Sequence, residues 1–435
     1  MKIYAALFAL LLAVLSARGE NRFPMPQFES GYAMPAAAEP GAHPGLFEAL
    51  DAAVLLGALS LAAWLVLRRR SRRGVLLLSV FSLLYFGFWR RGCICPVGSI
   101  QNVALWLFDG GYVIPLSAAA FFILPLAFAL LFGRVFCAAV CPLGAVQDLV
   151  VLFPVRIPRH LARALGFFPY LFLALGVLLA SAGAGFMICR YDPFVAFFRL
   201  SGDLAALAAG AALLLLGVFV ARPYCRFMCP YGVLLNWMSR LSKWHASIYP
   251  DECVQCRLCE RACPFDAILV PNSSLVPEPR EKGARRLTAL LALLPFLALA
   301  GGWAGASLDA KLSANHPVVR QADALKGAPA ASGSFKSKML ESFALGGGKA
   351  EDVRARAAAV REKIRLGGWI AGGFLGAALG LGLIGVSIRR SRDSYEPDRG
   401  ECLSCARCFM SCPREHLRLR GGGKIEPENG GAHGG

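Results

Sequence analysis

Seven apolar stretches recur along this 435-residue chain, and they restrict its fold more than any other feature does. Hydrophobic residues make up 56% of the sequence and its mean hydropathy is +0.53, far from the composition of an ordinary soluble domain. Inside a bilayer every backbone polar group needs an internal partner, so an apolar stretch of about 20 residues crosses it as an α-helix. We therefore expect a mostly α fold, a polytopic membrane bundle of about seven helices, at residues 46–67, 74–89, 111–132, 165–188, 202–221, 287–304 and 367–388.

The distribution of arginines predicts the orientation of this bundle. The chain carries a net charge of +18, and its arginines lie beside apolar stretches rather than in a separate basic domain. This is the pattern of positively charged cytoplasmic loops, not of a nucleic-acid-binding protein. The first loop is fixed on the cytoplasmic side by Arg68, Arg69, Arg70, Arg72 and Arg73. By alternation, loops 133–164 and 222–286 and the tail after residue 388 share that side, in a bacterial cytoplasmic (inner) membrane.

The N-terminus has the pattern of a secretory signal. Lys2 precedes an apolar run over residues 3–15, and Ala17-Arg18-Gly19 resembles a cleavage site. Residues 1–19 are therefore predicted to be a signal peptide, with an uncleaved anchor helix as the alternative. Residues 20–45 are rich in Pro, Gly and Ala and predict an extended extracytoplasmic lead-in.

Two cysteine quartets share one spacing. The first is Cys253-x2-Cys256-x2-Cys259-x3-Cys263-Pro264, and the second is Cys402-x2-Cys405-x2-Cys408-x3-Cys412-Pro413. This is the spacing with which bacterial ferredoxins hold [4Fe–4S] clusters. A zinc ribbon pairs two Cys-x2-Cys knuckles and needs neither the third cysteine nor the trailing Cys-Pro. The sequence therefore predicts two [4Fe–4S] clusters.

The quartets are 138 residues apart (264–401), with two predicted membrane helices between them, yet both fall on the cytoplasmic side. In two-cluster ferredoxins the fourth cysteine of each quartet binds the other cluster. We expect residues 251–270 and 396–416 to be the halves of one split ferredoxin domain. The alternative is two independent clusters, but a quartet of about twelve residues has little core of its own. The expected ligand sets are Cys253, Cys256, Cys259 and Cys412 for one cluster, and Cys402, Cys405, Cys408 and Cys263 for the other.

The remaining segments predict less. Residues 305–366 are expected to form a solvated extracytoplasmic helical segment, and residues 417–435 a flexible tail. Gly305-Ala306-Ser307 matches a flavin-attachment motif in three residues only, so no flavin is expected. None of the six histidines faces another within a membrane helix, so haem is not expected either.

An internal repeat adds four cysteines to the predicted sites. Residues 133–144 and 221–232 each contain an arginine, an aromatic residue and Cys-x3-Cys-Pro-x-Gly, at the cytoplasmic end of a predicted helix. Cysteines at helical spacing can pack as small apolar side chains. The repeated context instead favours one further iron–sulfur cluster, with zinc as the weaker alternative. Its ligands would be Cys137, Cys141, Cys225 and Cys229.

A variant of the repeat is predicted on the opposite side of the membrane. It contains Cys93 and Cys95, and Cys189 is the other cysteine on that side. The three thiols could bind a metal with a fourth ligand such as Asp192, or they could contain a disulfide, since the extracytoplasmic space is oxidising. The sequence leaves both interpretations open.

Several membrane spans, repeated Cys-x3-Cys-Pro sequences and two ferredoxin quartets together resemble the NosR/NapH-type membrane polyferredoxins. The resemblance covers about residues 75–265 and 385–415. It implies an electron carrier, rather than a stand-alone enzyme, that relays electrons between the quinone pool, or a cytoplasmic donor, and an extracytoplasmic redox partner. The alternative function is an assembly factor that reduces metal or thiols while a partner metalloenzyme matures. The insertion between the quartets and the Cys93/Cys95 variant depart from the family pattern, so the acceptor cannot be carried over.

Overall fold

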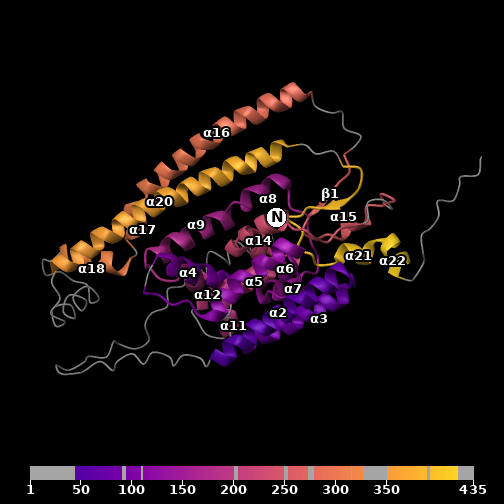
Figure 1. Ribbon diagram of the computed structural model, residues 1–435, viewed down its shortest axis with the longest axis horizontal. Helices are drawn as coiled ribbons and strands as arrows, with labels where there is room; N and C mark the ends of the chain where they lie inside the picture. Colours follow the sequence, from indigo (N-terminus) through magenta and orange to yellow (C-terminus); the bar gives the residue numbers. More distant parts are fainter. Residues whose placement is uncertain are drawn as a thin grey trace, which may run out of the picture.

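The computed structural model in Figure 1 is a bundle of helices with a small ferredoxin-like module at one end. It describes residues 45–90, 95–108, 111–199, 204–248, 253–272, 279–314, 316–326, 350–388 and 392–419. The predicted signal peptide, nearly all of the lead-in and the tail beyond residue 419 lie outside these ranges, as does Cys93.

The predicted apolar stretches are helical. Among the described residues, five helices are long and apolar enough to cross a membrane: Leu46–Leu67, Arg72–Trp89, His160–Ser181, Arg280–Ser307 and Ala350–Ser387. A sixth crossing results if α11 (Pro193–Arg199) and α12 (Leu204–Phe219) are counted as one bent span. The remaining predicted stretch becomes α5 (Leu116–Phe132), a shorter apolar helix. A mostly helical fold with several candidate membrane spans is thus confirmed.

Short helices fill the interior of the bundle between the long ones. They are α4 (Pro96–Phe108), α6 (Val135–Ala139), α7 (Pro142–Val150), α10 (Met187–Tyr191), α13 (Pro223–Phe227) and α14 (Pro230–Arg240). Gly133, with φ of +75°, turns the chain at the end of α5. Proline is the first residue of α7 and of α14, where its missing N–H is not needed. The main core joins these short helices to α2 (Gly45–Leu67) and α3 (Arg72–Ser82) through buried side chains such as Phe86, Phe121 and Tyr231.

Two long helices, α16 (Arg280–Ser307) and α20 (Ala350–Ser387), form an antiparallel pair along one side of the bundle (Figure 1). Their backbones approach so closely that a Cβ atom on Gly372 would lie 2.1 Å from the carbonyl oxygen of Gly301. Small residues allow such close packing between membrane helices. The sequence placed a boundary between the charged residues 351–365 and a span at 367–388, whereas α20 runs through both without a break.

The ferredoxin-like module joins two distant parts of the chain. Strand β1 (Ile268–Leu269) follows the first quartet and pairs antiparallel with β2 (Glu396–Pro397), which precedes the second. Hydrogen bonds extend this junction on both sides, from Asp398 N to Ala267 O (2.8 Å) and from Asn272 N to Arg392 O (2.9 Å). Helices α15 (Leu258–Ala262), α21 (Arg407–Ser411) and α22 (Pro413–Leu419) complete the module. The halves before and after the α16/α20 pair therefore lie together.

Candidate functional site

The two quartets adopt the same backbone conformation. In the first, Gln255 and Arg257 have φ of +51° and +63°; at the same positions of the second, Ser404 and Ala406 have φ of +54° and +62°. Residues other than glycine rarely adopt this region, and alternation between right- and left-handed residues turns successive N–H groups toward one point. Such a loop suits an anionic cluster, so the repeated conformation fits the predicted ligand.

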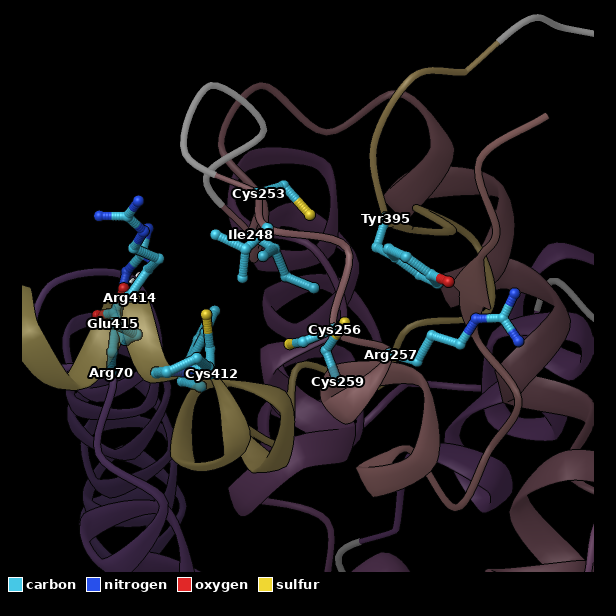
Figure 2. Close-up of a pocket in the computed structure, with 13 residues that line it drawn as sticks. Arg70, Ile248, Cys253, Cys256, Arg257, Cys259, Tyr395, Cys412, Arg414 and Glu415 are labelled. Carbon is cyan, nitrogen blue, oxygen red and sulfur yellow. Dashed lines mark hydrogen bonds and ion pairs between the residues drawn. The ribbon is translucent and has the colours of Figure 1, made fainter. Parts of the chain in front are cut away.

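The first hollow takes its thiols from both quartets. It is lined by Cys253, Cys256 and Cys259 from one quartet and by Cys412 from the other, and Figure 2 shows these four side chains around it. Ile248, Tyr395 and Phe409 supply apolar lining. These four cysteines are the set expected for one cluster of a split ferredoxin.

The second set lies beside the first. Cys263 packs with Cys402 and Cys405 in an apolar cluster that also contains Phe265 and Leu403. Cys408 is within electrostatic range of all three cysteines. The structure thus brings Cys263 to the second quartet, as Cys412 is brought to the first.

The spacing of the thiols fits a polynuclear centre better than a single ion. Among the described residues no three His, Cys, Asp or Glu side chains gather closely enough to hold one metal ion. In a cubane cluster each thiolate binds a different iron, so the four sulfurs surround the cluster rather than one atom.

Burial favours the protonated form of two of the quartet thiols, Cys402 and Cys259. Burial raises the pKa of Cys402 to about 12, although the backbone N–H of Ser404 opposes the change. Burial likewise raises the pKa of Cys259 to about 11. Iron would have to displace these protons, so cluster assembly is expected to release protons and to weaken in acid.

The inner four cysteines come together in the bundle. Cys137 lies in α6 and Cys225 in α13, while Cys141 and Cys229 are the residues before α7 and α14. The four are mutually within electrostatic range, and Gln147 donates a hydrogen bond from Nε2 to Cys225 Sγ (3.4 Å). The sequence predicts each pair at the end of a membrane helix. In the structure, the first cysteine of each pair lies in the short helix after the apolar helix, α6 after α5 or α13 after α12, and the second lies just before the following helix. All four pack against the main core.

Each copy of the inner repeat sends its arginine to the other copy. Arg222 donates a hydrogen bond to the carbonyl oxygen of Cys137 and lies against Gly144, while Arg134 lies against Gly232. The exposed fractions of Arg222 and Arg134 are 0% and 5%. In the described part of the chain, Nε of both side chains has no hydrogen-bond partner. Buried donors without acceptors are costly, and a cluster with four thiolates is an anion that would satisfy them. The inner cysteines therefore fit an iron–sulfur cluster.

Asp148 connects the inner cysteines to the ferredoxin-like module. Its carboxylate forms ion pairs with Arg72, with Arg222 (3.5 Å) and with Arg407 of α21 (3.1 Å). Burial raises the pKa of Asp148, but the positive charges of Arg222, Arg72 and Arg407 outweigh this effect and lower the pKa to about 2. Cys137 packs against the apolar cluster of the second quartet. The role of Asp148 was missed from the sequence, where the only signal is one acidic residue six positions after the Cys-Pro of the first copy.

Cys95 and Cys189 occupy the remaining part of the inner bundle. Their predicted position was the opposite membrane face, separate from the other cysteines. Instead, Cys95 is within electrostatic range of Cys141 and Cys229 as well as of Cys189. The short helices account for the difference, because they return the chain into the bundle.

Family models match the parts of the chain that carry these cysteines. A model described as a 4Fe-4S binding domain matches residues 114–160 and 203–248, which contain the inner cysteines. A second 4Fe-4S binding domain model matches residues 246–269, which contain the first quartet. No solved structure matches the chain.

Curated relatives share the same region. YccM of Escherichia coli is 30% identical over 189 residues, which cover 39% of this chain and 52% of YccM. NosR of Pseudomonas aeruginosa is 31% identical over 228 residues, covering 46% of this chain and 30% of NosR. MauN of Paracoccus denitrificans, a methylamine utilization ferredoxin-type protein, is 30% identical over 152 residues, covering 34% of this chain and 53% of MauN. The chain thus spans about half the length of these relatives or less. With its ferredoxin quartets and inner repeat, the chain is similar to the NosR/NapH-type membrane ferredoxins.

Proposed function

We propose that this protein relays electrons between the quinone pool or a cytoplasmic donor and an extracytoplasmic redox partner. One observation carries the proposal: three sets of thiols follow one another through the molecule. Cys408 of the second set packs against the apolar cluster that contains Cys259 of the first, and Cys137 of the inner set packs against the apolar cluster that contains Cys405 of the second. Iron–sulfur clusters supply one-electron transfer.

We place the ferredoxin-like module in the cytoplasm of a bacterial inner membrane. Arg70 and Arg72, from the arginine-rich loop after the first span, contact the module at Glu415 (2.9 Å) and at the carbonyl oxygen of Cys405 (3.2 Å). Because positively charged loops remain on the cytoplasmic side, the residues that dock the module also support its orientation.

A cavity beside the first quartet supports a quinone as electron donor. It has a volume of about 850 Å³ and is lined by aromatic side chains, including Phe132 and Trp244, whose rings stack at 5.6 Å. His245 also lines it, and burial, assisted by the charge of Arg399, lowers the pKa of this histidine, so the ring is neutral near pH 7. Arg70 and Phe409 line both this cavity and the hollow of the first quartet. A quinone head group needs such an aromatic wall with a few hydrogen-bonding groups.

Electron transfer across sealed vesicles tests the proposal. The purified protein would be reconstituted into vesicles that contain trapped oxidised cytochrome c, with dithionite added outside. We expect reduction of the trapped cytochrome with the wild-type protein and not with protein-free vesicles. Cys225→Ser should abolish this reduction while leaving the EPR signals of the quartet clusters in place. Equal rates for Cys225→Ser and wild type would contradict a path through the inner cysteines.

The same vesicles distinguish the assembly-factor alternative. That candidate would use Cys95 and Cys189, which lie outside the quartets and the four-cysteine site. A relay sustains many turnovers per protein, whereas a thiol reductant without a further donor stops after about one. A single turnover in the presence of excess dithionite would favour the assembly factor.

A further inference from the structure

We propose that Cys95, Cys189 and Asp192 form a second inner metal centre, built on the same internal repeat as the four-cysteine site, with Asp192 in the position of Cys229. The ligand would be an iron–sulfur cluster rather than a single ion, because no three His, Cys, Asp or Glu side chains among the described residues gather closely enough to hold one metal ion. The proposal extends the electron path and therefore rests on the proposed function.

Two further segments of the sequence resemble parts of the internal repeat. Residues 95–101 read CPVGSIQ, and residues 141–147 read CPLGAVQ. Residues 189–194 read CRYDPF, and residues 225–231 read CRFMCPY, so one deletion aligns the Asp-Pro of the former with the Cys-Pro of the latter. Each half of the four-cysteine site thus has a counterpart.

The glutamine of each copy makes the same contact. Gln147 Oε1 accepts a hydrogen bond from the backbone N–H of Tyr224 (3.1 Å), at the start of the helix that contains Cys225. Gln101 Oε1 accepts one from the backbone N–H of Cys189 (3.3 Å). With the amide of Gln101 turned over, the acceptor instead meets the N–H of Met187 (2.9 Å), in the first turn of the same helix. In both orientations the Gln101 side chain accepts a hydrogen bond from the backbone of α10, as the Gln147 side chain does from the backbone of α13.

Asp192 has the backbone conformation of the cysteine that it replaces. Its φ and ψ are −74° and 113°, and those of Cys229 are −68° and 110°; each precedes a proline that begins a helix. Asp192 is only 6% exposed, and its oxygens accept hydrogen bonds from Phe194 N (2.9 Å) and Tyr224 Oη (2.8 Å). In the part of the chain that the structure describes, no Lys or Arg forms an ion pair with it. A buried carboxylate without a cation is costly, and a metal would supply the missing charge.

Both sulfurs border Gly98. The Cys95 thiol is hydrogen-bonded to the backbone of Val97 and Gly98, and a Cβ on Gly98 would lie 3.1 Å from Cys189 Sγ. Gly144 has the same role in the other copy, where a Cβ would lie 3.2 Å from the carbonyl oxygen of Cys137. Glycine therefore allows close packing beside Cys189 Sγ in one site and beside the Cys137 backbone in the other. Two thiolates and one carboxylate favour a soft transition metal over Mg²⁺ or Ca²⁺.

The test is the metal content of the full-length protein, purified without oxygen, as wild type, Cys189→Ala and Asp192→Cys. Cys189→Ala should lose one centre, about four irons with their sulfide for a cubane, while the EPR signals of the quartets persist. Asp192→Cys should retain the metal and change its Mössbauer or optical spectrum. Cys225→Ser, which acts on the four-cysteine site, is the matched control and should leave this spectrum unchanged.

Two results would overturn the second inner centre. One is an equal metal content in Cys189→Ala and wild type; the other is a disulfide between Cys95 and Cys189 found by thiol counting in denaturant. If Cys189→Ala does not fold, Asp192→Cys decides, because an unchanged spectrum there excludes residue 192 as a ligand. A wild-type protein without iron would instead contradict the proposed function itself.

Discussion

Replacing Asp148 by asparagine should detach the ferredoxin-like module from the inner bundle. The carboxylate is 1% exposed and faces three guanidinium groups, of which Arg222 is fully buried and Arg407 belongs to α21. The pKa of about 2, against the usual 3.8, corresponds to about 2 kcal/mol of net electrostatic stabilisation despite the cost of burial. Removing one partner of a buried ion pair costs more, about 3–5 kcal/mol, because the charges left behind are uncompensated.

Hydrogen exchange measures this loss where it occurs. A cost of about 3 kcal/mol raises the equilibrium constant for opening by about 100-fold, since each 1.4 kcal/mol is a factor of ten. We expect faster exchange of the amides of α7 and α21 in Asp148→Asn, with α20 unchanged. Because the folded pKa is lowered, the wild-type contribution is complete above pH 3.8 and disappears as the pH falls through about 2.

Asp323→Asn is the matched control. Asp323 pairs with Arg361 at 2.7 Å, but the two side chains are 48% and 38% exposed. Exposed pairs contribute about 0.5 kcal/mol, so exchange near Asp323 should change less than about threefold. If Asp148→Asn changed exchange as little as this control does, the reasoning about the buried pairs would be wrong.

Two further changes test other parts of the structure. Gly372→Ala should destabilise the α16/α20 pair by about 1–3 kcal/mol, because the new methyl group would meet backbone atoms. Gly382→Ala, which would meet nothing within 4 Å, should not destabilise the pair. The free energies of unfolding of the two variants can be compared in mixed micelles. Trp244→Ala should weaken binding of a water-soluble quinone analogue about tenfold, through lost stacking and contact area, as measured by titration calorimetry. Trp303 in α16 is 75% exposed, and Trp303→Ala should bind the analogue as the wild type does. Equal affinities in the two tryptophan variants would remove the cavity as a quinone site.

Sequence reasoning succeeded where spacing alone determines geometry. The spacing of each quartet determines the conformation of its loop, and the arginine-rich first loop predicts both quartets on the same side of the membrane. The pairing of Cys412 with the first quartet could therefore be expected from the residues alone. Apolar stretches gave the helices for the same reason, because a bilayer offers few alternatives. The continuity of α20 was missed because the apolar stretch begins only at residue 367. The Ala, Arg and Glu residues before it are strong helix formers, so the helix extends through them.

The four inner cysteines were predicted to come together, but the position of Cys95 and the contacts around the inner cysteines could not be predicted in this way. Alternation of spans assigns each loop to one face and does not anticipate short helices that return into the bundle, so Cys95 was separated from Cys141. The hydrogen bond from Arg222 to Cys137 joins residues 85 positions apart in the chain, and the Asp148–Arg407 pair joins residues 259 apart. Such contacts follow from the packing of the whole bundle and have no local signal.

Counting irons in two double variants tests the central claim, that clusters assemble from thiols of both ferredoxin halves and of the inner repeat. At four irons per cluster, the three clusters of the quartets and the four-cysteine site require about twelve irons per wild-type chain, counted without the irons of the second inner centre. Cys253→Ser with Cys412→Ser should lose only one cluster, leaving about eight, because both cysteines belong to one set. Cys402→Ser with Cys412→Ser should lose two and leave about four. If the second pair also lost only one cluster, each quartet would hold its own; fewer than about eight irons in the wild type would contradict the account as a whole.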